Sequence, residues 1–125
     1  MLRDPPAPAP PRPMKRAFLG EFEEVVLLAV AILDEGAYGV PITQEIEQRT
    51  GRAVGFNSVH TTLQRLEAKG FLDSVMGGAT AERGGRRKRY FSLTAAGRKA
   101  LWEVKQTRAQ LWEAVPAKTL QLMDS

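Results

Sequence analysis

The sequence has no cysteine and a single histidine, His60. Disulfides, thiolate nucleophiles and metal sites built from thiolates or from two histidines are therefore excluded. Glu23 and Glu24 are neighbouring carboxylates, but adjacent positions of a helix point apart and do not converge on one substrate. A glycine-rich phosphate loop ahead of a helix is also missing. We therefore expect a protein that is not an enzyme and that holds no metal and no cofactor.

Long hydrophobic runs are missing as well. The longest apolar run covers residues 25–33, which is half of the roughly 18 residues that a membrane span requires. The first residues carry charge and proline where a secretory signal would carry an apolar stretch. We expect a cytoplasmic protein with no membrane partner.

Proline is concentrated in one place, because six of the eight prolines lie in residues 1–13. Such a run favours an extended polyproline conformation over a helix or a central strand. We interpret residues 1–17 as a disordered Pro/Ala-rich leader. A docking motif for a proline-binding module is the alternative.

Positive charge is concentrated in the second half of the chain. Residues 1–60 hold six Lys/Arg and eight Asp/Glu, whereas residues 61–125 hold twelve and six. With a pI near 9.8, this distribution indicates a polyanionic partner, which in the cytoplasm usually means nucleic acid.

The spacing of apolar residues predicts three helices, a β-hairpin and a longer fourth helix. Gly36, Gly51 and Gly70 stop the first three helices, and Thr94 caps the fourth before Pro116 ends it. The third helix would be capped by Asn57 or Ser58. The predicted ranges are helices at 20–35, 40–50, 58–69 and 95–115, and strands at 71–76 and 89–93. The fold class is therefore mainly α with a small β-hairpin.

The third helix has two chemically different faces. Val59, Leu63 and Leu66 form its apolar stripe, and the other side carries short or planar hydrogen-bonding side chains that suit base edges in a major groove. Taken alone, the helix favours an ordinary solvated face. The candidate DNA-reading residues are Asn57, Ser58, His60, Thr61, Gln64 and Arg65.

A basic run lies between the two predicted strands. Five cations fall within residues 83–89, and two glycines let the backbone approach a partner closely. We favour phosphate binding over a merely solubilising loop, because cations gathered in this way repel one another unless a polyanion neutralises them. The candidate residues are Arg83, Arg86, Arg87, Lys88 and Arg89, with Tyr90 following them.

Several segments together resemble the PadR family of transcriptional regulators, over about residues 18–113. The motif Leu-x-x-Leu-Glu-x-x-Gly at residues 63–70 also occurs in other winged-helix families such as MarR. Its occurrence together with the other segments is more specific to the PadR family. The segments are Tyr38-Gly39, Ser58-Val-His-Thr-Thr-Leu-Gln-Arg-Leu-Glu-Ala-Lys-Gly-Phe-Leu72 and Gly84-Gly-Arg-Arg-Lys-Arg-Tyr-Phe-Ser-Leu-Thr-Ala-Ala-Gly97.

The resemblance implies a winged helix-turn-helix domain over residues 18–94, with residues 83–90 as the wing. It implies a homodimer that binds double-stranded DNA at a roughly palindromic operator, most often as a repressor. A winged-helix module for protein interaction or ligand sensing, without operator recognition, is the alternative. His60 departs from the family, which commonly has tyrosine there, so base preference should not be transferred.

Residues 95–125 are predicted to form a dimerisation helix and a short tail. An apolar stripe on a helix this long exceeds what one small domain can cover, although packing within the monomer is the alternative. The resemblance to the PadR family also implies that the first helix packs beside this dimerisation helix. The candidate interface residues are Phe22, Val26, Leu101, Val104, Leu111 and Val115.

Trp102 and Trp112 lie slightly off this stripe. We favour interface anchors, a role in which tryptophan is enriched. The alternative is an effector pocket in which the two indoles stack on a planar hydrophobic small molecule.

Overall fold

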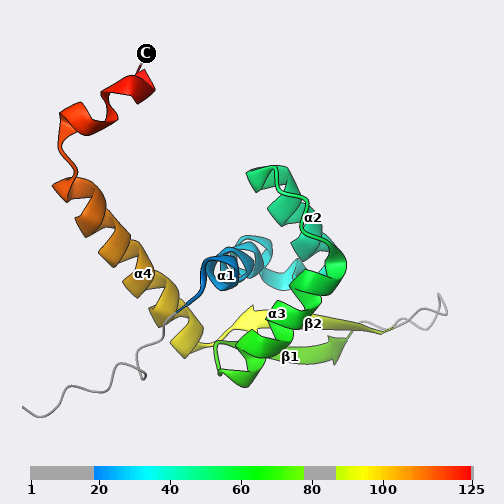
Figure 1. Ribbon diagram of the computed structural model, residues 1–125. Coiled ribbons are helices and arrows are strands. Elements are labelled where there is room, and N and C mark those ends of the chain that lie inside the picture. Colours follow the sequence, from blue (N-terminus) through cyan, green and yellow to red (C-terminus); the bar gives the residue numbers. More distant parts are fainter. Residues whose placement is uncertain (1–18, 78–86, 125) are drawn as a thin grey trace, which may run out of the picture.

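The computed structural model describes residues 19–77 and 87–124 of the 125-residue chain. The predicted leader at residues 1–17, and Arg83 and Arg86, lie outside the described residues. Figure 1 shows the order of the elements along the chain. They are α1 (Glu21–Leu33), the short 3-10 helix η2 (Asp34–Gly36), α2 (Gly39–Thr50), α3 (Phe56–Ala68), β1 (Leu72–Gly77), β2 (Lys88–Leu93), α4 (Ala95–Ala114) and the 3-10 helix η4 (Ala117–Asp124).

The first three helices and the hairpin enclose the core (Figure 1). The helices contribute apolar stripes at helical spacing, and each fully buried aliphatic side chain contributes roughly 1.5–3 kcal/mol relative to exposure. This arrangement confirms the predicted mainly α fold with a two-stranded antiparallel hairpin. The fully buried large side chains are Val26, Leu27 and Val30 in α1, Ile42 and Ile46 in α2, Val59, Leu63 and Leu66 in α3, and Leu72 in β1.

The core corrects one prediction about the dimer interface. Val26 has no exposed surface, because the apolar side of α1 packs against the chain's own helices and hairpin. A side chain that is covered within its own chain has no surface left for a second copy. The assignment of Val26 to the interface is therefore wrong.

The start of α3 corrects another prediction. The helix begins at Phe56, and its N-cap is Gly55, whose φ of 74° lies in the left-handed region that glycine adopts without strain. The chain therefore turns before Asn57 and Ser58, and both residues lie in the first helical turn. The prediction that one of them caps the helix is wrong.

Hydrogen bonds join the hairpin and the residue that follows it to the helical part of the chain at two places, after η2 and after α3. Antiparallel pairing sets Ser74 opposite Phe91, and the Phe91 N–H donates to the carbonyl of Ala37, which follows η2, at 2.8 Å. At the other end, the Thr94 hydroxyl donates to the carbonyl of Gly70 at 2.7 Å and accepts from the N–H of Gly97 at 2.9 Å. Thr94 thus caps α4, as predicted, and holds its start against the turn after α3.

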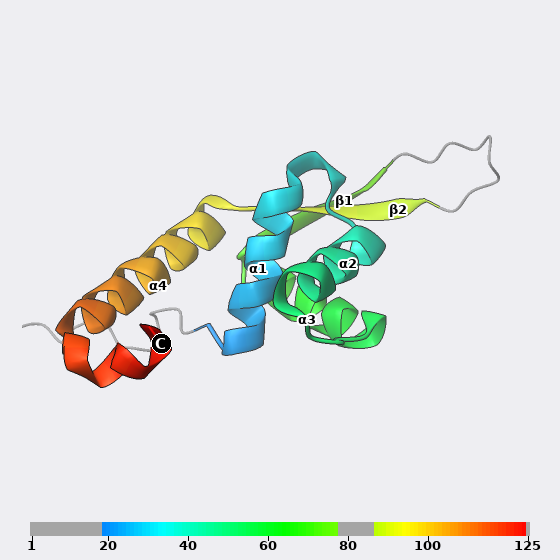
Figure 2. The ribbon, with the colours of Figure 1, turned by 90° about the horizontal axis from the view of Figure 1, so that it is seen from above.

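α4 leaves this point and extends away from the domain. In Figures 1 and 2 it runs on the side of α1 opposite α2, with η4 at its far end. Within the described ranges, the structure contains no helix that is both long enough and apolar enough to cross a membrane.

A buried carboxylate ties the first turn of α1 to the end of α3. Glu23 is 7% exposed and accepts hydrogen bonds from Lys69 Nζ at 2.8 and 3.0 Å and from the Gly20 N–H at 2.9 Å. Burial alone would raise the pKa of Glu23, but the bonds from Lys69 and Gly20 and the charges of Lys69 and Arg65 outweigh it. The pKa therefore lies below its ordinary value of 4.5.

This lowered pKa predicts the acid sensitivity of the fold. Ionised Glu23 stabilises the folded state at pH values above about 4.5, and this contribution is lost as the pH falls through the lower folded-state pKa. Glu23→Gln should lower the free energy of unfolding at pH 7 by about 1.5–3 kcal/mol, the range for a hydrogen bond to a charged group. Urea denaturation at pH 7, 4.5 and 3 measures this difference.

The difference between Glu23→Gln and the wild type should shrink below pH 4.5, where Glu23 itself becomes protonated. Glu21→Gln is the matched control, since it removes a carboxylate whose side chain is 62% exposed from the same turn. An equal loss of stability in both variants, or a Glu23→Gln effect that does not change with pH, would contradict this role for Glu23.

Candidate nucleic-acid interface

α3 presents its predicted polar residues to solvent. Val59, Leu63 and Leu66 have no exposed surface and hold the helix on the core. Since this stripe points inward, the opposite face points outward. The structure places all six predicted reading residues on the exposed part of the helix, namely Asn57, Ser58, His60, Thr61, Gln64 and Arg65.

An aromatic pair that sequence reasoning missed shapes the beginning of this face. Phe56 is 47% exposed, and its ring stacks on His60 with centroids 5.9 Å apart and planes 11° apart. A Cβ on Gly39 would lie 2.5 Å from Phe56 Cε1, so only glycine at this position leaves room for the ring as placed. The available signal was the four-residue spacing of Phe56 and His60, which brings side chains together on a helix.

Arg65 lies at the other end of the face, near the buried carboxylate of Glu23. Its Nη1 is 3.9 Å from Glu23 Oε2, and its side chain is 51% exposed. This distance is too long for a hydrogen bond, so the carboxylate attracts the guanidinium without occupying its N–H donors. Arg65 therefore keeps the planar donor group that suits a guanine edge or a phosphate.

The described part of the wing begins with three exposed cations, Arg87, Lys88 and Arg89. Lys88 Nζ lies 5.0 Å from the ring centroid of Tyr38, and this ring meets Tyr90 edge-to-face at 5.3 Å. The contact between Tyr38 and Tyr90 thus packs β2 against the segment after η2, and the ammonium group of Lys88 lies over the Tyr38 ring.

Arg89 is turned toward α3. Its Nη1 donates to the Ser74 hydroxyl at 2.9 Å, and this hydroxyl donates to Glu67 Oε2 on α3 at 2.7 Å. The chain of hydrogen bonds from β2 through β1 to α3 fixes the base of the wing relative to the polar helix face. Arg89 therefore contributes to positioning the wing, in addition to its charge.

The predicted interface residues differ in how far the chain itself covers them. Leu101 and Phe22 pack partly against the core, with the Arg52 guanidinium 5.5 Å from the Phe22 ring centroid. Val104 and Val115 are half-buried, whereas Leu111 is 64% exposed. The outer part of α4 therefore presents apolar surface to solvent.

Trp102 and Trp112 are both 60% exposed. Ten residues along a helix separate them by about 15 Å along the axis, and by about 80° around it. The two indoles of one chain therefore cannot stack on the same planar molecule. The structure does not bring these two residues together into one pocket within the chain.

Comparison with known proteins places this geometry in a family. The model of the transcriptional regulator PadR-like family matches residues 27–103, which is more than half of the chain. An uncharacterized protein of Lysinibacillus sphaericus is 30% identical over 98 residues, which cover 77% of this chain and 85% of that protein. The chain belongs to the PadR-like family of transcriptional regulators.

Solved structures of other PadR-like proteins share the fold. A PadR-like transcriptional regulator from Bacillus cereus superimposes with a TM-score of 0.63 at 17% identity, covering 83% of this chain and 92% of that one. A PadR-like transcription factor from Bacteroides fragilis gives a TM-score of 0.62 at 24% identity, with coverages of 74% and 84%. The family and these neighbours are regulators of transcription, not enzymes.

The family match ends within α4. It covers α3 and the hairpin of this PadR-like chain, but residues 104–125 lie beyond it. The segment beyond the match therefore includes Arg108, Leu111 and Trp112.

The single histidine makes the aromatic pair testable by NMR. We expect Phe56→Leu to shift the two carbon-bound ring proton resonances of His60, because the ring current of the stacked Phe56 is lost. Gly39→Ala should shift them in the same direction, since the added Cβ displaces the Phe56 ring. One-dimensional and heteronuclear spectra of the folded variants measure these shifts.

Gly36→Ala is the matched control, because a Cβ there meets nothing within 4 Å. It should leave the His60 resonances in place. Unchanged resonances in Phe56→Leu would show that the two rings do not stack in solution.

Proposed function

We propose that this PadR-like chain is a sequence-specific DNA-binding repressor that acts in the cytoplasm as a homodimer on a roughly palindromic operator. The observation that carries the proposal is the exposed polar face of α3. Its six side chains lie beside a hairpin whose described end begins with Arg87 and Lys88. A helix that presents such donors and acceptors next to a cationic hairpin suits a major groove flanked by phosphates.

The two parts of this surface have different tasks. Amide and guanidinium groups on α3 read base edges, with Asn57 and Gln64 suited to adenine and Arg65 to guanine. The cations of the wing neutralise phosphates and release counterions without reading sequence. The stacked Phe56 restricts the orientation of the His60 ring and thereby limits which base or phosphate its nitrogens reach.

The outer part of α4 supports the homodimer. Leu111 and Trp112, which are adjacent in this part, expose 64% and 60% of their surface, and exposed apolar groups that lie together favour association. A second copy is the partner that a palindromic operator requires, since the two-fold axis of the dimer matches that of the DNA. A planar hydrophobic effector would then bind between tryptophans of different chains.

The division of tasks predicts different effects of two substitutions on DNA binding. Arg65→Ala should cost about 1–3 kcal/mol on the preferred duplex and relax the preference at one base position. Replacing Arg87 and Lys88 together by alanine should weaken all duplexes alike and lower the salt slope by about 2, since each phosphate contact contributes about 0.9. Lys105→Ala removes a cation from the exposed outer part of α4 and is the control.

Fluorescence anisotropy measures these effects on the duplex upstream of the chain's own gene and on a scrambled duplex, at two salt concentrations. A preference of about 10³-fold or more for the native duplex supports the proposal. Equal losses on both duplexes from both substitutions would contradict the division of tasks. The absence of any binding at low salt would overturn DNA recognition and favour an interaction or ligand-sensing module.

The proposed interface predicts the effect of a charge on α4. We expect the wild type to sediment at twice the 13.8 kDa mass of the chain and Leu111→Glu to sediment as a monomer, because the interface would have to bury an unpaired carboxylate. Gln110→Glu is the control, since it adds the same charge at the neighbouring exposed residue. A monomeric wild type in analytical ultracentrifugation would overturn the homodimer.

A further inference from the structure

The apolar packing between α4 and the winged domain is confined to the first half of the helix. Gly97 and Ala100 are buried against the domain, and Leu101 and Val104 are half-buried. Every residue from 105 to 114 is exposed. Apolar packing therefore holds only the base of α4, and the outer half, which carries Leu111 of the proposed dimer interface, stands free of the core.

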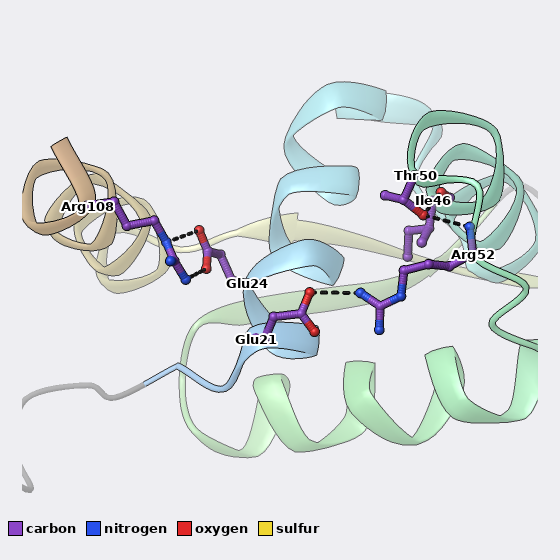
Figure 3. Close-up of polar contacts among 6 residues, drawn as sticks. All are labelled: Glu21, Glu24, Ile46, Thr50, Arg52 and Arg108. Atoms are coloured by element: carbon purple, nitrogen blue, oxygen red, sulfur yellow. Dashed lines mark hydrogen bonds and ion pairs between the residues drawn. The ribbon is translucent and has the colours of Figure 1, made fainter. Parts of the chain in front are cut away.

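One ion pair bridges from this outer half back to the domain. Arg108 Nη2 lies 2.7 Å from Glu24 Oε1, and Arg108 Nε lies 3.3 Å from Glu24 Oε2. Figure 3 shows the two groups facing each other across the gap between α4 and α1. Within residues 19–77 and 87–124, the hydrogen bonds and ion pairs that join the outer half of α4 to the domain all come from Arg108.

The geometry of this pair suits a positioning role. Exposed ion pairs usually contribute little, but a two-point contact between a guanidinium and a carboxylate restricts direction as well as distance. The Glu24 side chain is only 17% exposed, so its carboxylate is screened from solvent more than the Arg108 side chain, which is 55% exposed. The hydrogen bond and charge of Glu24 raise the pKa of Arg108 above its ordinary value.

The neighbouring residue continues the connection to the recognition helix. Glu23, adjacent to Glu24 on the first turn of α1, accepts two hydrogen bonds from Lys69 at the end of α3. The same turn of α1 therefore contacts α3 on one side and α4 on the other. This turn of α1 therefore connects α3, which is proposed to read DNA, with α4, which is proposed to pair with a second copy.

A small change in the direction of α4 has a large effect at the DNA. Arg108 lies eight residues beyond Ala100, which places the ion pair about 12 Å from the packed base of the helix. A tilt of about 10° over a helix about 30 Å long moves its far end by about 5 Å, which is the rise of about one and a half base pairs. In a dimer that reads DNA, the separation of the two recognition helices sets the half-site spacing.

We propose that Glu24 and Arg108 are positioning residues that set the separation of the two recognition helices in the dimer, and thereby the half-site spacing it accepts. The proposal rests on the homodimer and the DNA binding proposed above. It assigns no DNA contact to either residue. It predicts that loss of the ion pair changes the tolerated spacing and leaves the half-site sequence as it was.

The absence of cysteine allows a direct measurement. Gln48→Cys on the exposed end of α2 provides one spin-label position per chain, and pulsed electron paramagnetic resonance then measures the label-to-label distance in the full-length dimer. We expect a narrow distance distribution in the labelled protein that retains Arg108. In Arg108→Gln the distribution should widen or shift by up to about 5 Å, and Arg108→Lys should lie between the two. Lys105→Gln, on the same helix, should match the unchanged protein.

Selection of duplexes from a random-sequence pool gives the functional readout. The wild-type chain should recover inverted half-sites at one spacing, and Arg108→Gln should recover the same half-sites at several spacings. Identical distance distributions and spacings in Arg108→Gln and wild type would overturn this proposal and leave the proposed function standing. A wild type without dipolar coupling between labels, or without any selected half-site, would overturn the proposed function and this inference with it.

Discussion

The arrangement of the chain depends on the first turn of α1, where three carboxylates contact α3, α4 and the segment between α2 and α3. Glu23 binds Lys69 at the end of α3, and Glu24 binds Arg108 on α4. Glu21 binds Arg52 in the segment between α2 and α3 at 2.7 Å (Figure 3). Negative charge also suits the N-terminal end of a helix, where backbone N–H groups lack partners within the helix. This turn therefore stabilises α1 and places its neighbours at the same time.

The positive charge of the chain serves two purposes that composition does not separate. Some cations are engaged within the fold, as Lys69 and Arg108 are with carboxylates and Arg89 is with Ser74. Others, including Arg87, are exposed on the part of the hairpin that the structure describes. A basic pI therefore overstates the surface available to a polyanion, and the proposed DNA-binding surface is defined by position on α3 and β2.

Local signals predicted most of the fold and the exposed face of α3. The apolar stripe of Val59, Leu63 and Leu66 follows the period of a helix, so the outward direction of the opposite face follows from it. The predicted cap of the same helix was wrong, because Gly55 supplies a left-handed turn before Asn57 can act. Residue preference alone could not decide between a favourable cap and a glycine that starts the helix two residues earlier.

The sequence by itself determined the helices, the hairpin, the cap at Thr94 and the family to which the chain belongs, because these depend on periodicity and on motifs within short segments. Only the tertiary structure decided that Val26 is covered by its own chain, that Phe56 stacks on His60 with room provided by Gly39, and that α4 is held to α1. The partners Glu23 and Lys69 are 46 residues apart, and Glu24 and Arg108 are 84 residues apart. Contacts over such separations depend on how the helices pack, and no local pattern of charge specifies which cation meets which carboxylate.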